Sequence, residues 1–227
     1  VARDAETGLS LDLELRATKP LVAHGDRGLS PKSDEPGNAS YYVGYTRMAA
    51  RGRVASPASG GPVEVAGEAW FDHEWSTSAL GASAVGWDWF SLQLDDGREL
   101  MHFQIRREDG SVEPVSGGTL VEKDGHTRRL SRDDVRIEVL AQWTSPQSGA
   151  RYPSRWRLAV PSEGLDLLVE PRVTDQEMRT SFVYWEGAVR VNGTASPVDP
   201  ARGAPRPVAG QGYVELTGYA ASMQGVL

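Results

Sequence analysis

The chain has 227 residues, no cysteine and a formal net charge of −7 at pH 7. The lack of cysteine excludes disulfides, thiolate metal sites and cysteine nucleophiles. An acidic chain without a basic stripe argues against a nucleic-acid surface. No apolar run reaches the roughly 20 residues of a membrane-spanning helix. The sequence shows no signal-peptide pattern, but it opens without Met, so this leaves secretion open. The 25 glycines and 14 prolines are widely spread and leave little room for helices, which favours an all-β protein.

The first predicted strand covers residues 9–16, where leucines alternate with polar residues. Such alternation is typical of a strand with one buried face. Residues 25–38 are rich in Gly, Pro and Ser, so we expect a long irregular loop that marks a crossover or a domain boundary. An aromatic-rich strand over residues 41–48 follows this loop.

The rest of the chain predicts a series of strands joined by tight turns. Asp-Gly and Asn-Gly pairs stand between several alternating runs, and they suit the positive φ of hairpin turns. This pattern indicates an antiparallel meander, closed as a barrel or folded as a sandwich. A short helix is expected near residues 175–179, and a loop at 195–209. The predicted strands are residues 63–76, 87–94, 100–107, 119–122, 135–143, 155–160, 165–170, 182–191 and 212–219.

The densest group of titratable and aromatic residues lies at residues 67–76. In a strand, Glu68, Trp70, Asp72 and Glu74 share one face, and His73 lies on the other. A carboxyl group among aromatic rings has a raised pKa and can donate a proton near neutral pH. We therefore interpret Asp72 as a candidate acid, with His73 orienting it or shuttling the proton. The alternative is a strand whose acids only form ion pairs.

A second group follows at Trp87, Asp88, Trp89 and Phe90. Trp87 and Trp89 share one strand face and could line a cavity for an apolar ligand, although tryptophans also fill barrel cores. Asp88, an acid between two tryptophans, is a further catalytic candidate. His102 is another: it could approach His73 if the polar face of its strand lines the interior, and the equal alternative is a histidine that faces solvent.

Other site chemistries find little support in the sequence. The four histidines show no metal-binding spacing, and a site built from residues 72–74 and His102 would need convergence in space. We therefore expect no metal and no cofactor. No nucleophile elbow or phosphate loop occurs. A further aromatic and acidic set forms either the far wall of the same pocket or barrel packing, and comprises Tyr184, Trp185, Glu186, Tyr213 and Glu215.

These motifs together resemble the AttH-like family, which includes the carotenoid 1,2-hydratases (hydroxyneurosporene synthases) and many bacterial proteins described as secreted hydrolases. The resemblance covers nearly the whole chain. It rests on residues 67–75 and 86–97, with further matches at Lys19-Pro20, residues 24–28, Tyr41-Tyr42, residues 152–156, 184–187 and 212–219.

The resemblance implies two lipocalin-like antiparallel β-barrel domains. Residues 1–50 would be the tail of the first domain with a linker, and residues 51–227 the second domain. Members of the family carry a further N-terminal portion with a Glu-Trp-Trp-Tyr motif, which this sequence lacks. We therefore expect the missing domain of the same protein to be a partner. The resemblance also implies a secreted or periplasmic location.

In the hydratases an acid protonates a double bond, and water captures the cation. Their His-x-Trp motif matches His73 and Trp75, but their Tyr-x-Asp falls at Leu100 and His102. Both key side chains of that motif therefore differ, and carotenoid is not the expected substrate.

The sequence thus predicts acid/base chemistry (hydration, isomerisation or cyclisation) on a hydrophobic small molecule. Two alternatives remain: a non-catalytic carrier of an apolar ligand, and a glycan-processing protein that pairs Asp72 with Glu186. The predicted catalytic residues are Asp72, His73, Asp88 and His102, and the predicted ligand contacts are Trp75, Trp87, Trp89, Tyr184, Trp185 and Tyr213.

Overall fold

The structure, a computed structural model, describes residues 1–76, 80–81, 83–197, 201 and 203–223. No residue in these ranges is assigned to an α-helix, and three complete 3-10 turns lie within them: Pro57–Ser59, Arg132–Asp134 and Pro161–Glu163. None of the described helices has the length and apolar character that crossing a bilayer requires. The sequence-based prediction of an all-β protein is therefore confirmed.

The strands form two antiparallel sheets. In the first sheet, β5 pairs with β2, β3, β4 and β6, and β1 pairs with β2. Its strands are β1 (Ala2–Arg3), β2 (Ser10–Ala17), β3 (Val22–Ala23), β4 (Leu29–Pro31), β5 (Ala39–Ala55) and β6 (Val63–Ser76).

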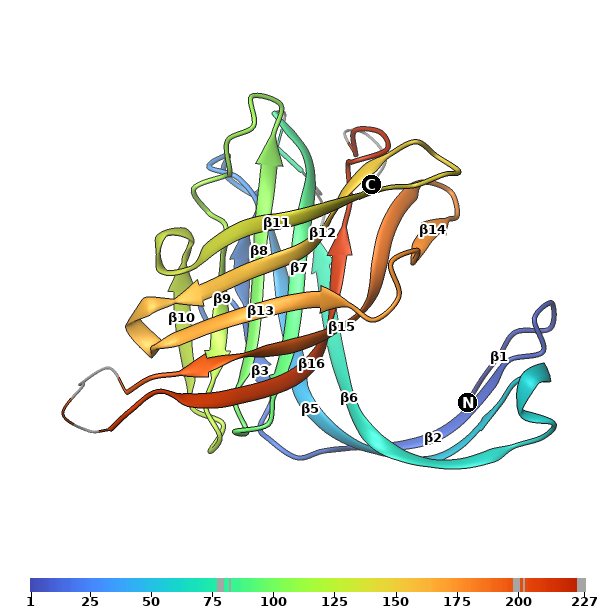
Figure 1. Ribbon diagram of the computed structural model, residues 1–227. Coiled ribbons are helices and arrows are strands. Elements are labelled where there is room, and N and C mark those ends of the chain that lie inside the picture. Colours follow the sequence, from blue (N-terminus) through green and yellow to red (C-terminus); the bar gives the residue numbers. More distant parts are fainter. Residues whose placement is uncertain (77–79, 82, 198–200, 202, 224–227) are drawn as a thin grey trace.

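The second sheet has the order β10-β9-β8-β7-β16-β15-β13-β12-β11, with β14 paired to β15. It curls around an apolar core, in agreement with the lipocalin-like prediction (Figure 1). Its strands are β7 (Ala84–Leu94), β8 (Glu99–Arg107), β9 (Gly117–Val121), β10 (Thr127–Ser131), β11 (Arg136–Thr144), β12 (Arg151–Val160), β13 (Leu165–Pro171), β14 (Glu177–Arg179), β15 (Val183–Ala195) and β16 (Arg206–Leu216).

The core of the curled sheet is filled by side chains from alternate strand positions. Trp156 is fully buried, and its ring meets that of Phe90 edge-on at 5.6 Å between centroids. Full burial of a large apolar side chain stabilises a fold by about 1.5–3 kcal/mol. The interior is therefore packed, and the space for a ligand lies elsewhere, between the two sheets.

The first sheet is both a wall and an arm. The first part of β5 and the last part of β6 lie against β7 and β8, whereas their other ends leave the body with β2 as a curved arm (Figure 1). One arm face is apolar and exposed: Leu11, Leu15, Val63 and Val65 lie on it. The opposite face is charged and holds the Arg53–Glu64 ion pair.

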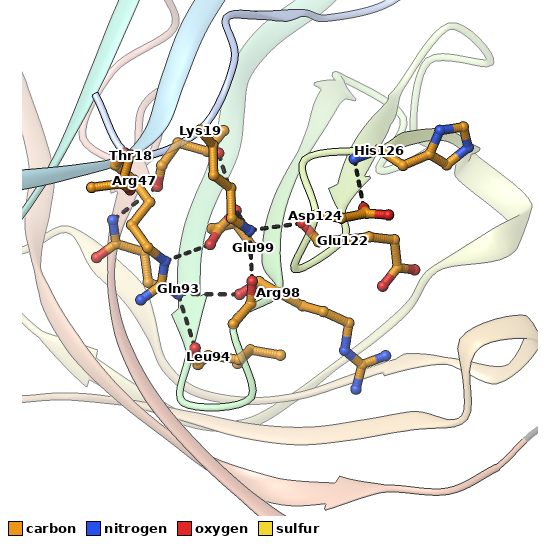
Figure 2. A network of polar contacts seen from close by, with 12 residues as sticks. Thr18, Lys19, Arg47, Gln93, Leu94, Arg98, Glu99, Glu122, Asp124 and His126 are labelled. Carbon is orange, nitrogen blue, oxygen red and sulfur yellow. Dashed lines mark hydrogen bonds and ion pairs between the residues drawn. The ribbon is translucent and has the colours of Figure 1, made fainter.

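A buried ionic network joins the base of the arm to the second sheet (Figure 2). Glu99 on β8 is fully buried, and its two oxygens bind Arg47 Nε at 2.5 Å and Lys19 Nζ at 2.7 Å. Arg47 lies in a bulge of β5, where the register with β6 shifts between Tyr45 and Met48. A bulge redirects side chains locally, and here it accompanies an arginine that reaches across the sheet interface.

Most predicted strands are present, but the structure adds β4 within the loop expected at residues 25–38 and β10 where no strand was predicted. The helix expected near residues 175–179 is wrong, because Glu177–Arg179 form β14 and pair with β15. The loop expected at 195–209 ends early, since β16 begins at Arg206; residues 198–200 and 202 lie outside the described residues. β5 runs unbroken through residue 50, where the sequence places the domain boundary, and that two-domain division stays a prediction.

Candidate functional site

A cleft of about 580 Å³ lies between the two sheets. Its walls combine aromatic rings with three carboxyl groups and one lysine. The lining residues are Lys32, Ser40, Tyr42, Asp72, Glu74, Trp75, Ser76, Leu80, Trp87, Trp89, Phe103, Ile105 and Glu215. Such a mixture of apolar walls and few polar groups is typical of small-molecule sites.

Asp72 lies in this cleft on the face of β6 that the alternation predicts. Its Oδ2 accepts a hydrogen bond from the Tyr42 hydroxyl at 2.7 Å, and its Oδ1 accepts one from the Trp70 indole at 2.8 Å. Trp89 in turn donates its indole N–H to the Tyr42 oxygen at 3.0 Å. Two strands of one sheet and one strand of the other therefore hold the carboxyl group.

Burial raises the pKa of Asp72 to about 6, even though the Tyr42 and Trp70 hydrogen bonds lower it; the charge of Glu74 adds to the rise. Desolvation disfavours the charged carboxylate, whereas hydrogen-bond donors favour it. A pKa near 6 leaves a usable protonated fraction at neutral pH. Asp72 can therefore act as a proton donor, and its donors stabilise the carboxylate that remains.

Lys32 and Glu74 form the charged pair of the cleft. The Lys32 Nζ lies 2.5 Å from Glu74 Oε1, and Ser40 donates its hydroxyl proton to the same oxygen. The ammonium group also lies 4.8 Å from the centre of the Phe103 ring. Glu74 thus has a basic partner, whereas Asp72 and Glu215 are the carboxyl groups of the cleft without one in the described part of the chain.

Glu215 reaches the cleft from β16, in the second sheet. Burial raises its pKa to about 7, and the nearby charges of Glu186, Glu74 and Asp72 contribute, whereas a hydrogen bond from Trp87 opposes the rise. The cleft therefore holds two carboxyl groups with raised pKa values on opposite walls. The sequence grouped Glu215 only with an aromatic set, because alternation alone does not show which sheet it faces.

His73 lies on the outer face of β6, away from Asp72, and is exposed. Its ring packs between Phe71, at 6.4 Å, and Trp75, at 4.9 Å between centroids. Trp75 also stacks on Tyr41 at 5.6 Å and reaches the cleft lining. The structure therefore brings Trp75 to the cleft and leaves His73 without a contact to Asp72.

Asp88 lies on the opposite face of β7 from Trp87 and Trp89 and does not line the cleft. It is 2 % exposed and accepts hydrogen bonds from Arg106 Nε at 3.0 Å, Gln104 at 2.8 Å and the Tyr219 hydroxyl at 3.0 Å. The guanidinium of Arg106 covers the Tyr219 ring. These contacts make Asp88 the centre of a buried structural network in this fold.

His102 is buried on β8, opposite Phe90 and Gly118 in the strand register. Its neighbours Met101, Phe103 and Ile105 face the cleft side, so the alternation places His102 on the barrel side. The structure does not bring it to the exposed His73. Burial lowers the pKa of His102 to about 4, which keeps the ring neutral.

The other predicted ligand contacts divide among three places. Trp87 and Trp89 line the cleft as expected. Tyr213 lines a neighbouring hollow of about 460 Å³ and donates its hydroxyl to Glu186 at 3.1 Å. Trp185 is buried in the barrel core, and Tyr184 packs against Phe182; neither lines the cleft.

Sequence reasoning missed Tyr42, Lys32 and Phe103 as cleft residues. Tyr42 was visible as part of the Tyr41-Tyr42 pair, but nothing in the chain showed which tyrosine faces inward. No group of three or more metal-ligating side chains was found within the described residues. What the described cleft offers is therefore a buried proton donor beside aromatic walls.

The AttH-like family model matches residues 2–219. Among solved structures, a candidate AttH protein from Nitrosomonas europaea is 35% identical with a TM-score of 0.82; the match covers 95% of this chain and 63% of that one. A search of the curated proteins found no match.

Two more distant structures share the fold. Kievitone hydratase from Nectria haematococca is 17% identical with a TM-score of 0.75, and the match covers 97% of this chain and 64% of that one. CghA is 15% identical with a TM-score of 0.57, covering 96% of this chain and 63% of that one. The chain therefore spans less than two thirds of the length of these three structures.

Proposed function

Because the chain belongs to the AttH-like family, we propose that it is an enzyme in which Asp72 acts as a general acid on a hydrophobic small molecule. The reaction class is hydration, isomerisation or cyclisation. One observation carries this proposal: a carboxyl group with a raised pKa, held by Tyr42 and Trp70, lies in an aromatic-lined cleft.

The chemistry follows from the contacts of Asp72. Its proton passes to one carbon of a double bond in the bound molecule, and the neighbouring carbon becomes cationic. The ring faces of Trp75, Trp87 and Trp89 line the same cleft and stabilise a cation by cation–π attraction. Capture by water with loss of a proton gives an alcohol; loss of a different carbon-bound proton gives an isomer. That proton restores Asp72, so no other reagent is consumed.

The name of one structural neighbour, kievitone hydratase, is consistent with water addition, although at 17% identity it supports the fold alone. The positions that match the Tyr-x-Asp motif of carotenoid hydratases, Leu100 and His102, are both buried, and neither lines the cleft. This placement argues against a carotenoid substrate. A smaller hydrophobic molecule suits a cleft of about 580 Å³ better.

A carrier function is the second candidate, because the same rings would hold an apolar ligand without any reaction. A glycan-processing pair of Asp72 and Glu186 has less support, since Glu186 binds Tyr213 and does not line the cleft.

The variant Asp72→Asn separates an enzyme from a carrier. The ligand that co-purifies with the full-length protein is identified by mass spectrometry, and then binding and turnover are measured on both forms. An enzyme of the proposed kind loses turnover by at least 100-fold, the contribution expected of a general acid, while affinity changes little. Glu138→Gln, at an exposed carboxyl on β11, is the matched control. Equal turnover in Asp72→Asn would refute the role of Asp72.

We propose further that the apolar face of the arm is covered by the N-terminal domain that the family resemblance implies. Two observations support it: Leu11, Leu15, Val63 and Val65 are exposed together, and the relatives continue beyond the matched region. In the full-length protein, Leu15→Glu with Val65→Glu should loosen the domain contact, seen as faster proteolysis between the domains. Unchanged proteolysis would contradict this contact.

A further inference from the structure

His24 is a buried residue that the proposed chemistry does not use. It precedes the turn at residues 25–28, and its backbone N–H donates to the Tyr42 carbonyl at 3.0 Å while its carbonyl accepts from Gly28 at 2.9 Å. Its side chain has no exposed surface. The ring lies 4.4 Å from that of Tyr42, and Nδ1 lies 3.0 Å from Thr119 Oγ1 on β9. Both sheets therefore fix the imidazole in place.

The other ring nitrogen, Nε2, is buried and has no hydrogen-bond partner among the described residues. A buried polar atom without a partner costs about 1–3 kcal/mol, so such atoms are rare and usually bind water. Burial lowers the pKa of His24 to about 4, with the charge of Lys32 as a smaller cause. The ring is therefore neutral, and Nε2 can either donate or accept according to its tautomer.

Gly44 shows where Nε2 points. A Cβ on Gly44 would lie 3.2 Å from His24 Nε2, 2.6 Å from Asp72 Oδ1 and 2.9 Å from the Phe71 carbonyl oxygen. Because His24 Nε2 and Asp72 Oδ1 lie within 3.2 and 2.6 Å of that one point, they are at most about 5.8 Å apart. No direct hydrogen bond joins the two atoms, because Nε2 has no partner among the described residues. Two hydrogen bonds of about 2.8 Å through one water oxygen join atoms up to about 5.6 Å apart.

We propose that one bound water molecule joins His24 Nε2 to Asp72 Oδ1 beside Gly44, and that His24 is thereby a positioning residue for the acid of the cleft. The water gives the orphaned nitrogen a partner and gives the carboxyl group a further hydrogen-bond donor. Gly44 is required because any side chain there would meet Asp72 Oδ1. The catalytic consequence rests on the proposed function; the water itself does not.

A water bridge has an electrostatic effect on Asp72. Water can donate to the carboxylate with either histidine tautomer, because it accepts from Nε2–H or donates its second proton to a bare Nε2. It therefore stabilises the ionised form, as other donors to a carboxylate do. The charged and titratable groups that already act on Asp72 are Tyr42 on β5, Glu74 on β6 and Glu215 on β16, with Lys32 paired to Glu74.

Two variants of one residue test this inference. An asparagine amide superimposes on Nδ1 of histidine, and a glutamine amide on Nε2. His24→Asn therefore keeps a polar group for Thr119 and loses the one that faces Asp72, whereas His24→Gln does the reverse. Crystal structures at high resolution and ¹³C NMR titration of the Asp72 carboxyl, both without ligand, compare the two with wild type.

The wild type and His24→Gln should show one water within hydrogen-bond distance of Asp72 Oδ1 and residue 24, and His24→Asn should lack it. The Asp72 midpoint should rise by about one pH unit in His24→Asn, a tenfold gain in proton affinity, and stay near the wild-type value in His24→Gln. A wild-type structure without that water, or equal titrations in both variants, would overturn the inference. The presence or absence of the water in the wild-type structure tests the inference even if a variant does not fold. Neither the crystal structure nor the titration depends on Asp72 being catalytic.

Discussion

Asp72 owes its properties to residues that are distant in sequence. The sequence predicted correctly that Asp72 and Trp70 share one face of β6, and in the structure the Trp70 side chain donates a hydrogen bond to Asp72. Its second donor, Tyr42, comes from the neighbouring strand, and the sequence could not show that this tyrosine is 2 % exposed while Tyr41 is 56 % exposed. Likewise, alternation separated Asp88 from Trp87 and Trp89 but could not tell which of the two faces lines a cavity.

Removing the Tyr42 hydroxyl should alter both stability and pH dependence. Tyr42→Phe deletes a donor that lowers the pKa of Asp72, so that pKa should rise further above 6. An acid works in its protonated form, and the fall of turnover with rising pH should therefore move to higher pH. Loss of two buried hydrogen bonds should cost about 1–3 kcal/mol in unfolding free energy. Tyr41→Phe, on the outer face, should change neither; an unmoved pH profile in Tyr42→Phe would contradict the assigned contact.

Glu215 should make the fold less stable as the pH rises. Its pKa is raised by burial from 4.5 to about 7 in the folded state, so its ionisation costs more there than in the unfolded chain. The favourable contribution is complete below pH 4.5 and is lost as the pH rises through 7. Urea unfolding of the wild type and of Glu215→Gln measures this effect. Relative to the variant, the unfolding free energy of the wild type should fall by an amount of the order of 3 kcal/mol between pH 4.5 and pH 7. Parallel pH dependences of the two forms would show that Glu215 is not buried as described.

At the scale of elements, strand positions were largely predictable and strand partners were not. Leucines alternating at residues 9–16 predicted β2, but its pairing with the far half of β5 depends on contacts no local pattern contains. The helix expected near residues 175–179 failed because pairing with β15 outweighs the weak local preference. The bulge in β5 was also invisible, although it accompanies the Arg47 contact with Glu99.

The Glu99 network should be a principal fixing point of the arm. Glu99→Gln removes a buried negative charge. Lys19 and Arg47, which are both largely buried, then lose their shared anionic partner. Breaking a buried ion pair from one side costs about 3–5 kcal/mol. Urea unfolding should show a loss of that order, whereas Glu64→Gln, in the exposed pair with Arg53, should change stability by less than about 1 kcal/mol. Equal losses in the two variants would disprove the anchoring role.

At the scale of the molecule, the packed barrel supports the second wall of a cleft whose other wall is the first sheet. On its barrel side, β8 carries a buried imidazole, that of His102, whose Nδ1 has no partner among the described residues. Together with His24, it makes the whole fold sensitive to acid. Both rings must stay neutral in the folded state, and the unfolded chain takes up protons first as the pH falls.

His102→Leu should remove part of that sensitivity. The folded pKa of His102 is lowered from 6.5 to about 4, so its contribution to stability is present above pH 6.5 and is lost as the pH falls toward 4. The stability of the variant relative to wild type should therefore grow by an amount of the order of 3 kcal/mol over this range. His126→Leu, at an exposed position, is the matched control for loss of an imidazole. A constant difference for His102→Leu across this pH range would contradict the burial of a neutral ring.

Deuterium transfer from solvent to the bound molecule tests the role of Asp72 as a proton donor. The full-length protein is incubated with its co-purified ligand in D₂O, and carbon-bound deuterium is measured by mass spectrometry. Proton donation from Asp72 predicts one deuterium at a carbon of the product with the wild type and none with Asp72→Asn, at similar ligand affinity. A bound ligand that stays unlabelled with the wild type, or equal labelling by Asp72→Asn, would contradict it.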